Sequence, residues 1–328
     1  MSKTKETKIE YYNRSCSLMM KALKEALEQE SKYAEKKIIL PYKGSRQIMM
    51  DIKHTSVWAA KKWSKDLRQS TWKQYRCSLI YMAEILNKKE IISNEELDSI
   101  KKLLRKVKGL SKSEAVVDKT SSSKKKSFNI KEIEELDQEL IDSKNIWSSP
   151  LRIWIRAAKY TGLRPVEWKN VKYLEESKEI IVINAKNTNG RSFGDVRTIN
   201  LKHLKDFMIK DILLQIKIAR SMDESGNWEK YYKGCSNLLR YTSRKIWKNK
   251  KKYPTLYSCR HQFSADMKAS GCTRREVAAL MGHGSDLTAE AHYGRKKYGK
   301  SSVKPEVNKN DLKMVKTGEK NRFKFDKK

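Results

Sequence analysis

The stretch EIIVINAKNTNGRSFGDVRTINL, residues 179–201, interrupts a chain that is otherwise patterned for helices. Residues 179–184 form a β-rich run, residues 187–195 contain Asn-Gly and Phe-Gly pairs, and residues 196–201 alternate again. β-rich runs on both sides of such a glycine-containing connection predict a β-hairpin. We therefore expect a mainly α fold with one small antiparallel sheet, which is an α+β class.

Upstream of the hairpin, apolar residues recur at steps of three and four, which is typical of helices. One helix is expected from about Ser70, and a second after the capping-box pair Ser93 and Glu96, before a stop at Gly109. Residues 6–38 also look helical. The apolar members of the two stripes are Trp72, Tyr75, Leu79, Met82 and Leu86, then Leu97, Ile100, Leu104 and Val107.

The segment SKSEAVVDKTSSSKKK, residues 111–126, has no aromatic residue and predicts an exposed linker between two domains. Downstream, helices are expected at about 151–160, 204–220, 236–248, 256–270, 273–281 and 287–293. The Lys- and Arg-rich residues 295–328 predict a tail that is flexible until it contacts DNA or a partner subunit. The expected parts are a basic helical segment at 1–45, a helical domain at 46–110, a linker at 111–127, a second domain at 128–300 and a basic tail at 301–328.

The composition points to a polyanionic partner. The formal net charge is +34 over 328 residues, which is more than solubility requires and favours nucleic acid as the partner. No apolar stretch approaches the roughly 20 residues of a membrane span. The cysteines lack C-x-x-C spacing and the histidines lack H-E-x-x-H spacing, so we expect no metal, no cofactor and a reducing cytoplasm.

Candidate phosphate-binding arginines occur at two helix ends. In Thr161-Gly162-Leu163-Arg164-Pro165, glycine can end one helix and proline begin the next, which leaves Arg164 at the corner. Arg260 comes early in a second helix, where its guanidinium could bind the same anion. Its neighbour His261 is either a packed core group or a catalytic base.

His283 and Tyr293 are two further candidate site residues. His283 comes directly after Gly282, which is expected to end the helix that the capping pair Thr273 and Glu276 begins. A histidine at a helix C-terminus favours the charged imidazolium. Tyr293 precedes cationic residues that could favour its phenolate and make it a nucleophile.

The order of these motifs resembles the catalytic domain of the tyrosine recombinases, the phage-integrase family, over about residues 128–300. The region around Ser70–Tyr75 also looks like that family's core-binding domain. The resemblance implies that Arg164 and Arg260 clamp the phosphate, that His283 is the second histidine-position residue and that Tyr293 is the nucleophile. Tyr298 is the next candidate nucleophile.

The family's catalytic lysine lies in the hairpin, and the resemblance assigns this role to Lys186. Its rivals are Lys178, Arg191 and Arg197. The family often has histidine three residues before the second arginine, where this chain has Tyr257. A phenol can hydrogen-bond a phosphate but is a weaker proton shuttle near neutral pH, which leaves open whether Tyr257 replaces a general base.

The expected function is a site-specific DNA recombinase or integrase that works through a 3′-phosphotyrosyl intermediate, for a virus or other mobile element. The resemblance implies a homotetramer on DNA, with a monomer possible when free, and accessory DNA-bending proteins are possible partners. The expected location is the host cytoplasm, in association with the nucleoid. The alternatives are a tyrosine-type topoisomerase and a non-catalytic DNA-binding protein, including a degenerate integrase.

Overall fold

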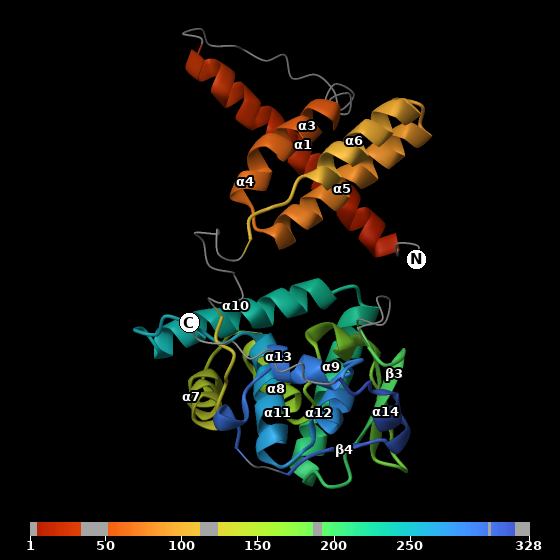
Figure 1. Cartoon of the computed structure of the whole chain (residues 1–328). Helices are drawn as coiled ribbons and strands as arrows, with labels where there is room; N and C mark the ends of the chain where they lie inside the picture. Colours follow the sequence, from red (N-terminus) through yellow and green to blue (C-terminus); the bar gives the residue numbers. More distant parts are fainter. Residues whose placement is uncertain (1–4, 34–51, 112–123, 186–191, 301–302, 319–328) are drawn as a thin grey trace, which may run out of the picture. The chain divides into compact units, whose positions relative to one another are not determined.

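The computed structural model describes residues 5–33, 52–111, 124–185, 192–300 and 303–318 (Figure 1). The chain divides into two compact units, Met1–Asp118 and Lys119–Lys328, and each has its own hydrophobic core. Within these described ranges, no helix is long and apolar enough to cross a lipid bilayer.

The first unit is helical. Its elements are α1 (Lys5–Tyr33), α3 (Ile52–Trp58), the π-helical turn η1 (Ala59–Trp63), α4 (Ser64–Asp66), α5 (Gln69–Lys88) and α6 (Asn94–Lys106). The helix predicted from about Ser70 is α5. The predicted capping box of Ser93 and Glu96 begins α6, with both hydrogen bonds formed. Trp72 and Leu79 of α5 and Leu104 of α6 are buried in one core, as the stripes predict.

Helix α1 belongs to this same core. Leu18, Met19 and Ala22 are buried in it, and α1 contacts both α3 and α5. The helix ends at Tyr33, and residues 34–38 of the predicted helix lie outside the described residues. The N-terminal segment therefore folds together with α3 and α5.

The second unit is mainly helical with one sheet. Its helices are α7 (Ile130–Ile141), α8 (Ser148–Thr161), the 3-10 helix η2 (Pro165–Asn170), α9 (Asp206–Glu224), α10 (Trp228–Ile246), α11 (Leu256–Ala269), α12 (Arg274–Leu280), α13 (Asp286–His292), the 3-10 helix η4 (Lys296–Tyr298) and α14 (Lys309–Met314). Helix α10 begins earlier than predicted. Its added first turns bury Trp228 and Tyr231, whose rings pack against Trp154 of α8 at centroid distances of 5.8 and 5.0 Å.

The predicted hairpin is confirmed as β2 (Glu179–Ile183) and β3 (Val196–Asn200), but the sheet is larger than the hairpin. Strands β1 (Lys172–Leu174) and β4 (Glu306–Val307) extend it in the antiparallel order β1-β2-β3-β4. Both added strands are too short to show alternation in sequence. Helix α12 lies beside β3 and β4.

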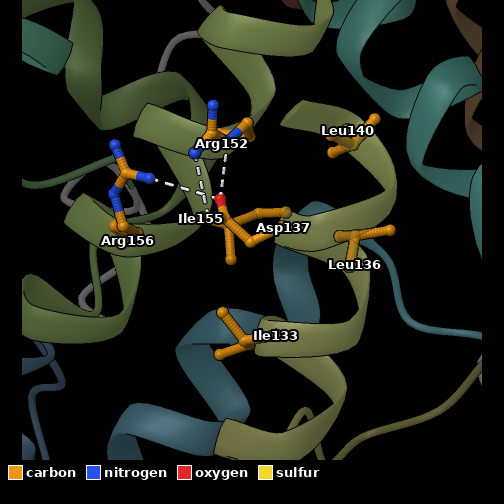
Figure 2. A pocket seen from close by; sticks show the side chains of 7 residues that line it. All are labelled: Ile133, Leu136, Asp137, Leu140, Arg152, Ile155 and Arg156. Carbon is orange, nitrogen blue, oxygen red and sulfur yellow. Dashed lines mark hydrogen bonds and ion pairs between the residues drawn. The ribbon is translucent and has the colours of Figure 1, made fainter. Parts of the chain in front are cut away.

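A network of charged side chains joins α7, α8 and α9 of this unit. Asp137 of α7 accepts hydrogen bonds from Arg152 of α8 at 2.7 and 3.0 Å and from Arg156 at 3.2 Å (Figure 2). Arg156 also pairs with Asp211 of α9. The hydrogen bonds from Arg152, opposed by partial burial, hold the pKa of Asp137 below its usual range. These bonds fix α7, α8 and α9 to one another.

The predicted flexible tail is wrong for part of its length. Residues 303–318 include β4 and α14, and Val315 is buried against Phe193 and Ala278. The Gly318 N–H donates to Asp286 at 2.9 Å. The segment folds because β4 completes a sheet edge, which is a tertiary interaction that charge composition does not reveal.

Candidate active site

Arg164 lies at the corner between α8 and η2, as the sequence predicts. Gly162 ends α8 with a φ of 62°, and a Cβ there would lie 2.3 Å from the Phe263 ring, so both the turn and the packing require glycine. Pro165 begins η2. The Arg164 side chain is buried, and its Nη1 donates to Glu167 Oε1 at 2.5 Å.

Arg260, on α11, lies at the C-terminal ends of two helices. Its Nη1 donates to the carbonyl of Gly162, the C-cap of α8, at 2.6 Å. Its Nη2 donates to the carbonyl of Met281, the C-cap of α12, and lies 3.1 Å from His283 Nε2. Cations are stabilised by the carbonyls of helix C-termini, and the Arg260 side chain is fully buried there.

Glu167 joins the two predicted arginines to a third. The fully buried Arg197 of β3 donates to both Glu167 oxygens, at 2.7 and 3.3 Å, and Arg260 Nη1 lies 3.8 Å from Glu167 Oε2. We call Arg164, Arg197, Arg260 and Glu167 the arginine cluster. Burial alone would raise the pKa of Glu167, but the charges of Arg197, Arg260 and Arg164 outweigh burial and hold this pKa far below its usual value.

Glu167 was missed by the sequence analysis, although the sequence carries a signal for it. It is the third residue of the helix that Pro165 begins, and a carboxylate at this position can accept the N–H of the residue before the helix. Its Oε2 accepts the Arg164 N–H at 2.8 Å in this way. The signal was hidden because Glu167 lies in a short 3-10 helix that has no apolar stripe.

Two of the other candidates for the lysine role, Arg197 and Lys178, differ in burial and position. Arg197 is bonded to Glu167 and to the Leu280 carbonyl, so its fully buried side chain is held inside the protein and does not fit a group that reaches into DNA. Lys178 is exposed in the turn before β2. That turn is at the opposite end of β2 from Asn184, whose side chain contacts the cluster through Arg197.

Lys186 and Arg191 lie outside the described residues. The chain leading to Lys186 can be followed to the cluster, because the Ala185 N–H donates to Glu167 Oε1 at 3.4 Å. Lys186 is the next residue in the sequence.

His283 lies beside Arg260, but the prediction that it is an imidazolium is wrong. Burial, followed by the charges of Arg260 and the other arginines of the cluster, lowers its pKa far below the usual value. Since Arg260 Nη2 donates to His283 Nε2, the neutral ring carries its proton on Nδ1. Gly282, with a φ of 64°, makes this turn, and a Cβ there would meet the Asn184 side chain at 2.3 Å.

Tyr293 enters the cluster from the C-terminal end of α13, and Tyr257 enters it from the first turn of α11. Their hydroxyl oxygens are 2.7 Å apart. The Tyr293 ring lies between two histidines, with centroids 4.9 Å from His261 and 4.8 Å from His283. The Arg260 guanidinium carbon lies 5.3 Å from the Tyr293 ring centroid.

The residues around Tyr293 are tied to α11. A Cβ on Gly294 would lie 2.3 Å from the His261 carbonyl oxygen, so glycine permits a close approach there. The Gly294 carbonyl accepts a hydrogen bond from Lys268 at 2.8 Å. His261 is half-buried, and burial lowers its pKa to about 4, which leaves it neutral and packed against Tyr293.

The two hydroxyls differ in acidity. Burial would raise the pKa of Tyr293, but the charge of Arg260, the hydrogen bond from Tyr257 and the charge of Arg164 together lower it below the usual value of about 10. For Tyr257 burial dominates and raises the pKa, with Arg260 acting against it. Tyr293 is therefore the phenol of this pair that ionises first.

Buried donors without a partner occur in the same cluster. Within the part of the chain that the structure describes, Arg164 Nε, Arg260 Nε and His283 Nδ1 are buried and lack a hydrogen-bond partner. Unpaired buried donors are costly, and an anion with several acceptor oxygens would satisfy them. The described residues contain no group of His, Cys, Asp and Glu side chains suited to a metal ion. The donor set thus fits a phosphate.

The structure therefore brings together Arg164, Tyr257, Arg260, His283 and Tyr293 of the predicted site. Lys186 is the predicted residue whose position is not described. Glu167 and Arg197 complete the cluster.

No protein-family model and no curated protein matches the chain. Among solved structures it is similar to the Tn1549 transposon integrase in complex with a circular intermediate DNA, at 14% identity and a TM-score of 0.42, covering 86% of this chain and 95% of that one. It is also similar to XerH site-specific recombinase bound to a palindromic difH substrate (15%, 0.43, covering 93% and 78%) and to a lambda integrase tetramer bound to a Holliday junction (16%, 0.36, covering 86% and 79%). These are integrases and a site-specific recombinase, the kind of protein that the sequence motifs resemble. At such identities and TM-scores, function has to be inferred from the site itself.

Proposed function

We propose that this chain is a tyrosine recombinase, which cuts and rejoins double-stranded DNA at specific sites through a 3′-phosphotyrosyl intermediate. The observation that carries the proposal is the half-buried Tyr293 side chain, whose hydroxyl lies among Arg164, Arg260 and His283. Each of these three neighbours has a buried N–H group without a partner, and such donors suit a phosphate. A nucleophile whose ionisation is favoured beside an anion-binding group is what phosphoryl transfer to a side chain requires.

Each step exchanges one phosphodiester for another. Tyr293 gives up its proton to solvent and attacks phosphorus through its phenolate oxygen, the bond to the 5′ oxygen breaks, and this oxygen leaves as a hydroxyl after gaining a proton. Arg164 and Arg260 neutralise the non-bridging oxygens, where negative charge accumulates in the transition state. In the second step a 5′-hydroxyl loses its proton and attacks the phosphotyrosine, and Tyr293 leaves as a phenolate that takes up a proton again. The bond energy is conserved, so the cycle balances without a nucleotide cofactor.

We propose that the partner is duplex DNA bearing recombination sites and that subunits of this chain act together on it, as a homotetramer. The net charge of +34 supplies the attraction to phosphates. A recombinase of this kind would serve to integrate or excise a mobile element or a viral genome, with accessory DNA-bending proteins, in the nucleoid of a host cell.

The test is a labelled suicide DNA substrate, whose nicked strand diffuses away after cleavage and traps the covalent intermediate. A recombinase gives a covalent adduct, and it also exchanges strands between two sites. A topoisomerase gives an adduct and relaxes supercoiled DNA without needing a second site. A protein that binds DNA but forms no adduct would be a degenerate integrase and would contradict the proposed catalysis.

Binding to DNA should depend strongly on salt. Because the charge of +34 implies many phosphate contacts, the logarithm of affinity should fall with that of salt concentration by about 0.9 for each phosphate neutralised. Fluorescence anisotropy with a labelled duplex over a salt series measures this slope. A slope near zero would contradict binding through the DNA backbone.

We propose Lys186 as the general acid that protonates the departing 5′ oxygen. Lys186→Ala should cleave ordinary DNA about 10²- to 10⁴-fold more slowly, the usual contribution of a positioned acid. Sulfur in place of the 5′ bridging oxygen leaves as a thiolate without a proton, so this substrate should recover most of the rate. Single-turnover cleavage of both substrates measures the effect.

Arg164→Ala is the matched control for this experiment. Its loss removes charge from the non-bridging oxygens, which the sulfur does not replace, so the sulfur-bridged substrate should not rescue it. If Lys186→Ala cleaves ordinary DNA at the parental rate, or if sulfur fails to restore it, another residue is the acid. Arg191 and Lys178 would then be given the same test.

A further inference from the structure

A hydrogen bond joins the hydroxyls of Tyr257 and Tyr293. Tyr257 stands where the resembling family often has histidine, and its hydroxyl lies 2.7 Å from the hydroxyl of the proposed nucleophile. It lies one helical turn before Arg260 on α11, so it faces the same cluster. A phenol at this place cannot accept a proton near neutral pH as an imidazole does. Tyr257 therefore has to act in some other way.

The groups that face the two hydroxyls are unequal in their effect. The cations are Arg260 on α11 and Arg164 at the start of η2, while His261 and His283 pack on the Tyr293 ring and are neutral. The Arg260 guanidinium lies 5.3 Å from the Tyr293 ring centroid, and the cations outweigh burial for the pKa of Tyr293 but not for that of Tyr257. Negative charge is therefore favoured on Tyr293. A second phenolate 2.7 Å away would be repelled by the first, so one member of the pair keeps its proton.

We propose that Tyr257 is a positioning residue for the reaction: its hydroxyl donates a hydrogen bond to the Tyr293 oxygen and stabilises the phenolate. This inference rests on the proposed function of Tyr293 as nucleophile. The hydrogen must run from Tyr257 to Tyr293, because an ionised Tyr293 has none to give. A hydrogen bond to a charged oxygen is stronger than one between neutral groups.

The same contact serves the return step. When a 5′-hydroxyl attacks the phosphotyrosine, the Tyr293 oxygen leaves with negative charge, and the Tyr257 hydroxyl is placed to stabilise that charge as it develops. Cleavage and rejoining should therefore both slow when the donor is lost. The ring of Tyr257 packs at 5.5 Å from that of His261, and phenylalanine keeps this packing.

The direct test is the pH dependence of cleavage in Tyr257→Phe. With the suicide substrate, we expect adduct formation at neutral pH to slow by about 10- to 100-fold, the effect of one charge-assisted hydrogen bond. The rise of rate with pH should move upward by about one to two units, because the phenolate forms less readily. Tyr253→Phe is the matched control, since its hydroxyl donates to the Trp247 carbonyl and does not contact the cluster.

The result that overturns the inference is a Tyr257→Phe enzyme with the parental pH profile. A rate that falls equally at every pH would also overturn it, because a purely structural role lowers activity without moving the profile. If the parent protein forms no adduct at any pH, the proposed function fails instead, and the inference is decided by a measurement that needs no activity.

That measurement is a spectrophotometric titration of tyrosine in the full-length protein. The parent should contain a phenol that ionises below the usual value of about 10, and Tyr293→Phe should lack it. In Tyr257→Phe this ionisation should move upward, and in Tyr253→Phe it should stay. An ionisation that is unchanged in Tyr257→Phe would show that Tyr257 does not stabilise the phenolate.

Discussion

Tyr293→Phe is expected to abolish covalent adduct formation while DNA affinity stays close to that of the parent. The substitution removes the oxygen that attacks phosphorus and keeps a ring that packs between His261 and His283. The loss should be about 10³-fold or more, as for other covalent nucleophiles. The suicide substrate measures the adduct, and anisotropy with the same duplex measures binding.

An adduct that survives in Tyr293→Phe would move the nucleophile, and the structure changes the identity of the next candidate. The sequence pointed to Tyr298. Its side chain is 53% exposed on η4, whereas the Tyr257 hydroxyl is 2.7 Å from that of Tyr293. Peptide mapping of the residual adduct would identify Tyr257, and the double Phe variant should then form none. An adduct on neither tyrosine would contradict the proposed site.

Among the substitutions considered, Glu167→Ala should lower the free energy of unfolding the most. Glu167 is almost fully buried and is ion-paired with Arg164, Arg197 and Arg260. Removing one partner of a buried ion pair leaves uncompensated charge and costs about 3–5 kcal/mol. Denaturant unfolding measures this loss as a change in the free energy of unfolding of the second unit. A loss below about 1 kcal/mol would contradict the inferred role of Glu167.

The pH dependence of that loss follows from the sign of the pKa shift. The pKa of Glu167 is lowered in the folded protein, so its stabilising effect is fully present above the unfolded value of about 4.3. The effect is lost as the pH falls below that value toward the folded pKa. The difference in the free energy of unfolding between the parent and Glu167→Ala should therefore narrow in acid. The variant Asp211→Asn is a suitable control, because its carboxylate pairs with Arg156 outside the cluster.

Much of the local structure could be predicted, because it depends on neighbouring residues. The predicted capping boxes at Ser93 and Thr273 both form, and the two-strand hairpin is where the β-rich runs place it. The elements that could not be predicted depend on distant partners. Strand β4 forms because it pairs with the edge of β3, and its two residues are too few to show a strand pattern in the sequence.

The site shows the same division. The family resemblance, which rests on the order of Arg164, Arg260, His283 and Tyr293 along the chain, predicted which residues meet. The charge state of His283 could not be predicted, because it depends on burial beside arginines from three separate segments. Arg197 is a similar case: it is one more hairpin cation in the sequence, and only its burial against Glu167 reveals a different role.

The position of Arg260 has a consequence for which substitutions would accumulate if recombination were no longer under selection. Its guanidinium donates to the C-cap carbonyls of α8 and α12 and also faces Tyr293, so a substitution there would weaken the packing of both helix ends and alter the proposed site. Tyr293 can lose its hydroxyl at little cost to folding. Among copies released from selection for recombination but kept for DNA binding, inactivating substitutions should therefore accumulate at Tyr293 while Arg260 persists. A retained Arg260 would then indicate a retained fold, and a retained Tyr293 would indicate retained recombination activity.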